Sequence, residues 1–227
     1  MYFTLIKLRK NLLPRDIAGL NGGDGYSFHK LLWNLFSDGP DRRRDFLYRF
    51  EAIKGMPTFY TVSERKPVDS GNMWDVHSKP YDPKLQKGDR LSFTVRVNPI
   101  RSKRDENGRQ QRHDVVMEAK NKVGFKNLPT DQRPHVGTLI QDAGIDWLKA
   151  RSTENGFSFE DTNVRSDGYF QHKLFKGKNT QPITFSTLDL NGILSIIEPA
   201  TFVEKCLFQG IGPAKGFGCG LMLVKRI

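Results

Sequence analysis

Hydrophobic and polar residues alternate along several segments of the chain, and a period of two is typical of strands with one buried face. The segment 90–98 shows this most clearly, because nine consecutive residues alternate. Pro67, Pro80 and Pro83 interrupt the pattern in the polar stretch 66–88. We therefore predict strands at 1–10, 45–53, 58–64, 90–98, 166–176, 182–196 (with a turn at Asn191-Gly192) and 221–224.

Three other segments carry apolar residues at helical spacing or begin with a helix-start signal. A helix is predicted over 25–36, capped by Asp24, because its apolar residues form one stripe at i, i+3, i+4, i+7 and i+8. Further helices are predicted over 138–151 and 199–209, the last with Pro199 at its first position. The stripe of the first helix consists of Phe28, Leu31, Leu32, Leu35 and Phe36.

The order of these elements is similar in the two halves of the chain. Each half reads as strand, helix, strand, strand, helix, strand, although the second helix of the first half has only a weak signal. This order predicts an α+β protein of two tandem ferredoxin-like (RRM-like) domains. We place the boundary near Pro99, which gives domains of 1–98 and 99–227.

The overall charge adds a prediction about the partner. Lys and Arg number 36 against 25 Asp and Glu, so the formal net charge is +11. Such a field attracts polyanions, above all nucleic acid, although acidic proteins and membranes are alternatives. The chain also has 16 Phe, six Tyr and three Trp, on which unpaired bases could stack.

Cellular location and bound groups are predicted from what the sequence lacks. No stretch approaches the length of a membrane span, and the first ten residues are too short and too charged for a secretory signal. Cys206 and Cys219 do not form a C-x-x-C pair, which gives no support for a zinc site or a disulfide framework. We expect a cytoplasmic protein with no membrane association, metal or cofactor.

A basic segment is the strongest candidate for nucleic-acid contact outside the glycine-rich end. Residues 101–126 hold eight Lys or Arg against four acids, and Asn107-Gly108 predicts a hairpin turn. A solvated loop is the alternative, in which case Lys173, with Lys176 and Lys178, is the next candidate. His113-Asp114 resembles a metal-binding dipeptide, but without further ligands at suitable spacing we predict the start of a strand. The predicted contacts of the segment are Arg101, Lys103, Arg104, Arg109 and Arg112.

The segment 210–220 has five glycines in eleven positions and precedes the last predicted strand. Glycines allow positive φ and close approach of the backbone to a ligand, and consecutive N–H groups can hold phosphate oxygens. Lys215 would add a positive charge, so we predict RNA contact by Lys215 and by the glycines that follow it, Gly216 and Gly218. Tight backbone packing is an equally good reading of such a loop.

The first predicted helix has a second face that could carry chemistry. Tyr26, His29, Lys30 and Trp33 fall at i, i+3, i+4 and i+7, opposite the apolar stripe. Imidazole titrates near neutral pH, a phenol can polarise the same oxygen, and a lysine can stabilise developing charge on phosphorus. The alternative is a solvated face without function.

Four blocks of the chain together resemble the CasE-type CRISPR RNA endoribonucleases of the type I-E (Cascade) system. The blocks are 26–36, 44–49, 112–119 and the glycine-rich 210–220, in the right order over nearly the whole chain. This resemblance implies two ferredoxin-like domains and metal-independent cleavage of the CRISPR repeat stem-loop. It implies that the upstream 2′-hydroxyl attacks phosphorus and leaves a 2′,3′-cyclic phosphate. His29 matches the principal acid–base residue, Tyr26 its partner, and Lys30 a position that is basic in some relatives.

Two other functions compete with the nuclease. In one, the chain is a non-catalytic RNA-binding subunit of a ribonucleoprotein, and in the other a basic scaffold for protein partners. The resemblance implies that catalysis and binding coexist, with the nuclease keeping its product beside the other Cascade subunits. Replacement of His29 separates the first two, and the salt dependence of RNA affinity separates the third.

Overall fold

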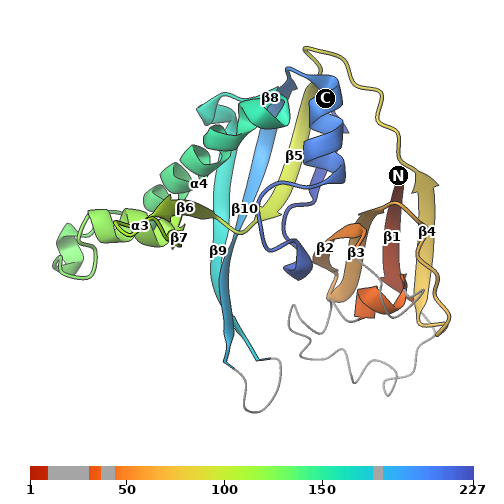
Figure 1. Ribbon diagram of the computed structural model, residues 1–227, viewed down its shortest axis with the longest axis horizontal. Coiled ribbons are helices and arrows are strands. Elements are labelled where there is room, and N and C mark those ends of the chain that lie inside the picture. The colour runs from red at the N-terminus through yellow and green to blue at the C-terminus, as the bar shows by residue number, and fades with distance from the viewer. Residues whose placement is uncertain (10–30, 37–43, 176–180) are drawn as a thin grey trace.

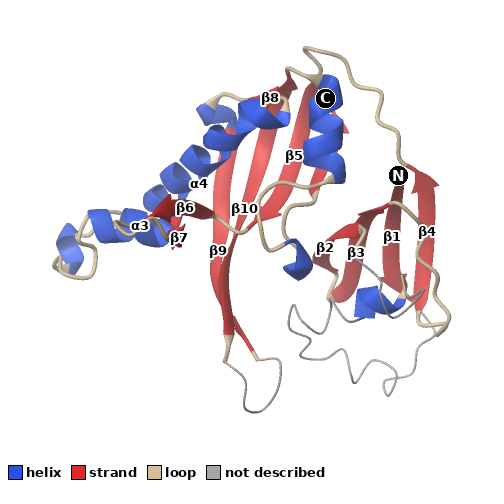
Figure 2. Ribbon diagram, viewed as in Figure 1, coloured by secondary structure: helices blue, strands red, loops and turns tan. Residues whose placement is uncertain are grey.

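The computed structural model describes residues 1–9, 31–36, 44–175 and 181–227. Two antiparallel sheets lie next to each other in this part of the chain, one built from the N-terminal strands and one from the later strands (Figure 1). Figure 2 shows that the longest helix lies on the second sheet, away from the first. No helix within these ranges is both long enough and apolar enough to span a bilayer.

The first sheet contains β1 (Tyr2–Leu8), β2 (Phe46–Ile53), β3 (Met56–Ser63) and β4 (Trp74–Pro80) in the order β2-β3-β1-β4. Lys54 and Gly55 join β2 to β3 with φ of 52° and 76°, as a two-residue hairpin turn requires. Strands β1 to β3 confirm the predictions. Strand β4 was missed, because it lies in the polar stretch 66–88. Residues 64–73, between β3 and β4, contain no helix.

One face of the first sheet is covered by the end of the first predicted helix. Residues 31–34 are helical, and Leu32, Leu35 and Phe36 are buried against the strands, which confirms the described part of the apolar stripe. Phe36 stacks on Phe46 at 4.3 Å between ring centroids. Trp33, predicted on the outer face, also packs on this core, edge-on to Phe46 at 5.7 Å. The assignment of Trp33 to the outer face was wrong, because its large indole is half-buried against the first core.

The second sheet contains β5 (Arg90–Val97), β9 (Val164–Leu174), β10 (Ile183–Ile196) and β11 (Met222–Arg226). Its order is β11-β5-β10-β9, and the short β8 (Phe157–Ser158) pairs with the end of β10. Because β5 pairs with both β10 and β11, it belongs to the second sheet. The predicted boundary at residue 99 therefore puts β5 in the wrong half, and the connection between the sheets runs through residues 81–89.

The long helix and the last helix of the second half bury side chains in one apolar cluster with the strands of this sheet. α4 (Val136–Ser152) confirms the predicted helix and lies so close to β9 that a Cβ on Gly144 would fall 2.1 Å from the Ser166 hydroxyl. The predicted last helix is α5 (Pro199–Thr201) continued by a π-helical turn, η4 (Phe202–Phe208). Short 3₁₀ turns are η1 (Thr130–Gln132), η2 (Thr153–Asn155), η3 (Asp161–Asn163) and η5 (Lys215–Phe217).

Strand β10 runs without a break through Asn191-Gly192, where we predicted a turn. The glycine has a different purpose there. A Cβ on Gly192 would lie 2.1 Å from the carbonyl oxygen of Asn163 and 2.9 Å from Cα of Val164. Glycine therefore permits close backbone contact between β10 and the start of β9, and the turn prediction was wrong.

The basic segment forms a separate hairpin of β6 (Ile100–Arg104) and β7 (Gln110–Asp114), which confirms the predicted hairpin. It is followed by α3 (Val115–Lys122), which we had not predicted. Asp114 ends the hairpin and caps this helix, because its carboxylate accepts the N–H groups of Val116 and Met117, both at 2.9 Å. The prediction of a strand beginning at His113-Asp114 was wrong.

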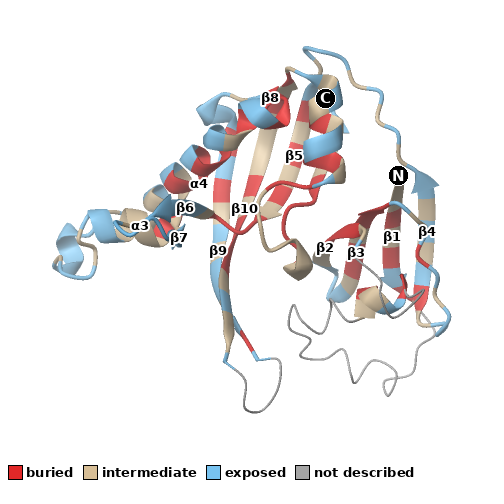
Figure 3. Cartoon of the chain, in the orientation of Figure 1, coloured by how far each residue is buried: buried red, intermediate tan, exposed pale blue. Residues whose placement is uncertain are grey.

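The two sheets meet in a third apolar cluster. Leu47 and Val62 of the first sheet are buried against Leu221, which precedes β11. Figure 3 shows buried residues in both sheets and along the segment that leads from η4 to β11. The glycine-rich segment thus runs through the contact between the sheets.

Candidate nucleic-acid interface

The residues predicted to be catalytic, Tyr26 and His29, and the neighbouring Lys30 lie outside the described residues. The structure describes the end of their predicted helix, where Leu32 is fully buried in the first core. The roles of these three side chains stay predictions.

Two of the predicted cations on the hairpin already have an anionic partner. Arg101 and Lys103 alternate along β6 and therefore share a face, and both contact the Glu118 carboxylate on α3. Arg101 Nη2 lies 3.0 Å from Glu118 Oε2. The hydrogen bond from Lys103, with smaller help from Arg101, lowers the pKa of Glu118 to about 2. This ion-pair group ties the base of the hairpin to the helix.

Three other cations of the hairpin remain exposed. Arg104 and Arg109 flank the turn, and Arg112 lies on β7; in the ranges that the structure describes, none has a carboxylate within ion-pair distance. The turn is held by Asp105, whose Oδ1 accepts the N–H groups of Asn107 and Arg109 at 3.0 and 2.8 Å. A rigid turn with uncompensated guanidinium groups suits contact with phosphates.

The glycine-rich segment packs against the first sheet. Gly218 has φ of 80°, and a Cβ there would lie 3.1 Å from the Tyr48 ring. The Tyr48 hydroxyl donates a hydrogen bond to the Gly216 carbonyl oxygen at 3.0 Å. Gly210 is equally constrained, since its Cβ would lie 2.8 Å from Leu47 Cδ1. The packing interpretation of the loop is confirmed, and phosphate binding stays a prediction.

Lys215 lies beside Arg44, a proximity that no sequence pattern indicated. Burial lowers the pKa of Lys215, and the charge of Arg44 lowers it further. Arg44 is exposed, yet its Nη1 lies 3.2 Å from the position of a Cβ on Gly216. Neither cation has an ion-pair partner within the described ranges. Two neighbouring positive charges without a carboxylate favour binding of an anion.

One hollow brings together two of the predicted cations and a residue of the glycine-rich segment. It has a volume of about 650 Å³ and is lined by Arg112 of β7, Lys173 of β9 and Phe217 of η5, among others. Sequence reasoning named the two cations separately and did not place them together. Phe217 lies between the predicted Gly216 and Gly218, so part of the glycine-rich segment borders the same hollow.

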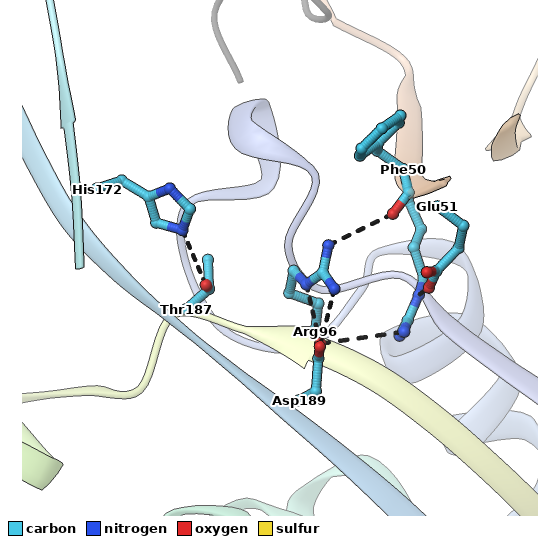
Figure 4. A network of polar contacts seen from close by, with 7 residues as sticks. Phe50, Glu51, Arg96, His172, Thr187 and Asp189 are labelled. Carbon is cyan, nitrogen blue, oxygen red and sulfur yellow. Dashed lines mark hydrogen bonds and ion pairs between the residues drawn. The ribbon is translucent and has the colours of Figure 1, made fainter. Parts of the chain in front are cut away.

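A polar network next to this hollow joins the two sheets (Figure 4). Arg96 of β5 makes two hydrogen bonds to Asp189 of β10, at 2.9 and 2.8 Å, and a third of 3.4 Å to the Phe50 carbonyl oxygen of β2. Arg49 of β2 is buried, pairs with Glu51 at 2.5 Å and lies 4.0 Å from Asp189. The network fixes β2 relative to the strands that border the hollow.

Among the described residues, no group of three or more His, Cys, Asp and Glu side chains is arranged to hold a metal ion. Cys206 and Cys219 are buried free thiols. The Asp114 carboxylate, part of the suspected dipeptide, is used as a helix cap and as an acceptor for the Tyr169 and Ser186 hydroxyls.

Comparison with known proteins gives matches over nearly the whole chain. The family model described as "CRISPR associated protein" matches residues 1–226. The CRISPR system Cascade subunit CasE of Escherichia coli is 30% identical, over 88% of this chain and 90% of its own length. The CRISPR-associated endoribonuclease Cse3 of Thermus thermophilus is 24% identical, over 92% of each chain. A solved structure of CRISPR endoribonuclease Cse3 bound to a 19-nucleotide RNA has a similar fold, with a TM-score of 0.70 and 22% identity over the full length of both chains.

Proposed function

Because this chain belongs to the CRISPR-associated protein family, we propose that it is a CasE-type endoribonuclease that cleaves CRISPR repeat RNA. It binds the stem-loop of the repeat, cuts the RNA to give mature guide RNA, and remains bound as a subunit of a Cascade complex. The observation that carries this proposal is the similarity to CasE, which extends over 88% of this chain. The net charge of +11 and the exposed cations around the hairpin support an RNA substrate.

The proposed chemistry uses the RNA's own 2′-hydroxyl as the nucleophile. The 2′-oxygen attacks the adjacent phosphorus and the bond to the 5′-oxygen breaks, which leaves a 2′,3′-cyclic phosphate and a 5′-hydroxyl. His29 moves the proton to or from these oxygens, and Tyr26 polarises the same site. Lys30 stabilises the charge that develops on phosphorus. No step of this scheme requires a metal ion or a cofactor.

The proposed RNA surface includes the hairpin, the strand β9 and the glycine-rich segment. Because Glu118 already engages Arg101 and Lys103, we assign the larger share of phosphate contact to cations without such a partner. Lys215 contributes charge beside Arg44, and Gly216 and Gly218 shape the segment that carries it. The freer cations on the hairpin and on β9 are Arg104, Arg109, Arg112 and Lys173.

We further propose that the two sheets are two tandem ferredoxin-like domains. When the four principal strands of each sheet are numbered in chain order, leaving out the short β8, both sheets have the spatial order 4-1-3-2. Each half also has its own buried cluster of apolar residues. The division then falls in residues 81–89, because β5 belongs to the second sheet. We propose a cytoplasmic location, where precursor RNA is available.

The proposal is tested by incubating the protein with a repeat stem-loop RNA in excess EDTA and analysing the ends of the products. We expect cleavage to proceed and to yield a 2′,3′-cyclic phosphate, whereas an RNA with a 2′-deoxyribose at the cleavage site is bound and not cut. A strict requirement for magnesium, or a 5′-phosphate on the product, would show that the reaction belongs to a different class.

Two histidine variants separate the nuclease from a binding subunit. His29→Ala should slow cleavage by about 100-fold or more, the effect of losing a general acid or base, while RNA affinity is retained. His77→Ala is the matched control, because His77 lies on the edge strand β4 of the first sheet and should leave the rate unchanged. Full activity of His29→Ala would remove His29 from the mechanism.

A further inference from the structure

Three aromatic rings from separate elements stack on one another beside the hollow. His172 of β9 lies 4.7 Å from Phe185 of β10, between ring centroids, with planes 14° apart. Phe185 lies 4.7 Å from Phe217 of the glycine-rich segment, with planes 26° apart. Phe170 extends the row, edge-on to His172 at 4.8 Å, and is 61% exposed. We call His172, Phe185 and Phe217 the aromatic row.

Strand pairing explains why the aromatic row is accessible. His172 pairs directly with Phe185, so both side chains point to the same face of the sheet. Strand β5 pairs with β10 only from Leu188 onward, so no strand of the described chain covers the other edge of residues 183–187. One side-chain contact there is the Asn98 amide, which donates to the Ser186 carbonyl oxygen at 2.7 Å. The hollow lies at this open edge, and all three rings of the row line it.

The charge of the hollow is positive. Of the described residues that line it, Arg112 and Lys173 are cations and Asp114 is a carboxylate. That carboxylate is occupied, because its oxygens accept two backbone N–H groups of α3 and the hydroxyls of Tyr169 and Ser186. The two cations are therefore free to attract an anion into a space whose walls include flat rings.

His172 contributes a ring surface to this space. Burial lowers the pKa of His172, and the charge of Arg96 lowers it further, and both effects favour the neutral imidazole. Its Nε2 shares a hydrogen bond of 2.9 Å with the Thr187 hydroxyl, which fixes the plane of the ring (Figure 4). Arg96 is in turn held by two hydrogen bonds to Asp189.

We propose that this hollow binds an unpaired nucleotide next to the stem of the RNA, its base against the aromatic row and its phosphate at Arg112 and Lys173. This proposal rests on the proposed function. Aromatic surfaces with cations beside them recognise unpaired bases, because the faces of paired bases are already stacked within a helix. The volume of about 650 Å³ is of the size that holds small ligands.

The test compares three RNAs that carry a 2′-deoxyribose at the cleavage site so that they stay intact. One is the stem-loop alone, and the others add a single-stranded extension on the 5′ or the 3′ side, with 2-aminopurine beside the stem. We expect one extension to raise affinity by about 5- to 150-fold, the range for stacking one base, and the fluorescence of its 2-aminopurine to fall on binding.

Phe185→Leu should abolish this advantage, because leucine keeps the apolar volume and removes the flat ring, while affinity for the bare stem-loop stays unchanged. Phe185→Tyr should restore the advantage. Phe175→Leu is the control, since Phe175 directly follows β9, is 56% exposed and does not line the hollow. Equal wild-type affinity for all three RNAs, or an undiminished advantage in Phe185→Leu, would overturn the inference. Failure to bind any of the RNAs would instead refute the proposed function.

Discussion

Gly216 and Gly218 are two residues apart in one segment, yet the structure predicts very different costs for placing alanine there. Gly218 has φ of 80°, a region that costs an L-residue about 1–2 kcal/mol. Its new Cβ would also lie 3.1 Å from the Tyr48 ring, and Tyr48 is buried in the first core with little freedom to move. Overpacking of this kind costs about 1–3 kcal/mol.

Gly216→Ala is the matched control. Gly216 does not have a positive φ, and the nearest neighbour of its new Cβ is Nη1 of Arg44 at 3.2 Å, the end of an exposed side chain that can swing away. We expect a cost below about 0.5 kcal/mol, as for ordinary surface substitutions. The sequence pattern treats the two glycines alike, but only Gly218 has the positive φ that makes a side chain costly there.

Urea unfolding of the two variants measures this difference. Gly218→Ala should lose about 2–5 kcal/mol of stability, the sum of strain and overpacking, with a lower midpoint and an unchanged slope. Its RNA affinity should also fall, because the displaced segment carries Lys215 and Phe217. Equal stability of both variants would refute the argument from φ and from contact with Tyr48.

Three further predictions concern charged groups. Replacing Arg104 and Arg109 by Gln should lower the slope of log affinity against log salt by about 0.7–0.9 for each lost phosphate contact, whereas the same change at Arg101 and Lys103, which Glu118 engages, should lower it less. Asp189→Asn should cost about 1–3 kcal/mol by thermal unfolding, because Arg96 loses a charged partner. Asp167→Asn, at a half-exposed carboxylate that pairs with Arg165, should change nothing measurable. The pKa of Glu118 is lowered to about 2 in the folded protein, against about 4.3 in the unfolded chain. The contribution of Glu118 to stability is therefore complete above about pH 4.3 and is lost as the pH falls toward 2. Glu118→Gln should remove this part of the acid dependence of unfolding.

Regular alternation and helical spacing were enough to predict most strands and the long helix α4. The misses have physical causes. β4 is an edge strand whose side chains are mostly polar or exposed, so it has no apolar period to detect. In α3 the residues Val115 and Val116 suggested a strand, although Asp114 was a usable helix-cap signal. Glycine after asparagine predicted a turn at Gly192, but there glycine instead permits close contact between two strands.

The candidate site was predictable only in part, because its geometry joins distant parts of the chain. The hairpin and its turn are local, and both were predicted. The aromatic row combines β9, β10 and the glycine-rich segment, and it depends on β5 leaving β10 at Leu188. Likewise, Arg44 and Lys215 are far apart in the sequence and meet only where the segment packs on β2.

The apolar cluster between the sheets has a practical consequence for work with fragments of this protein. Leu47 and Val62 are almost completely buried, and their cover comes from Leu221 and other residues near the C-terminal end. A fragment cut within residues 81–89 would therefore present these side chains to water and tend to associate with itself. Studies of the first half in isolation need polar replacements at this face, or co-expression of both halves so that each shields the other.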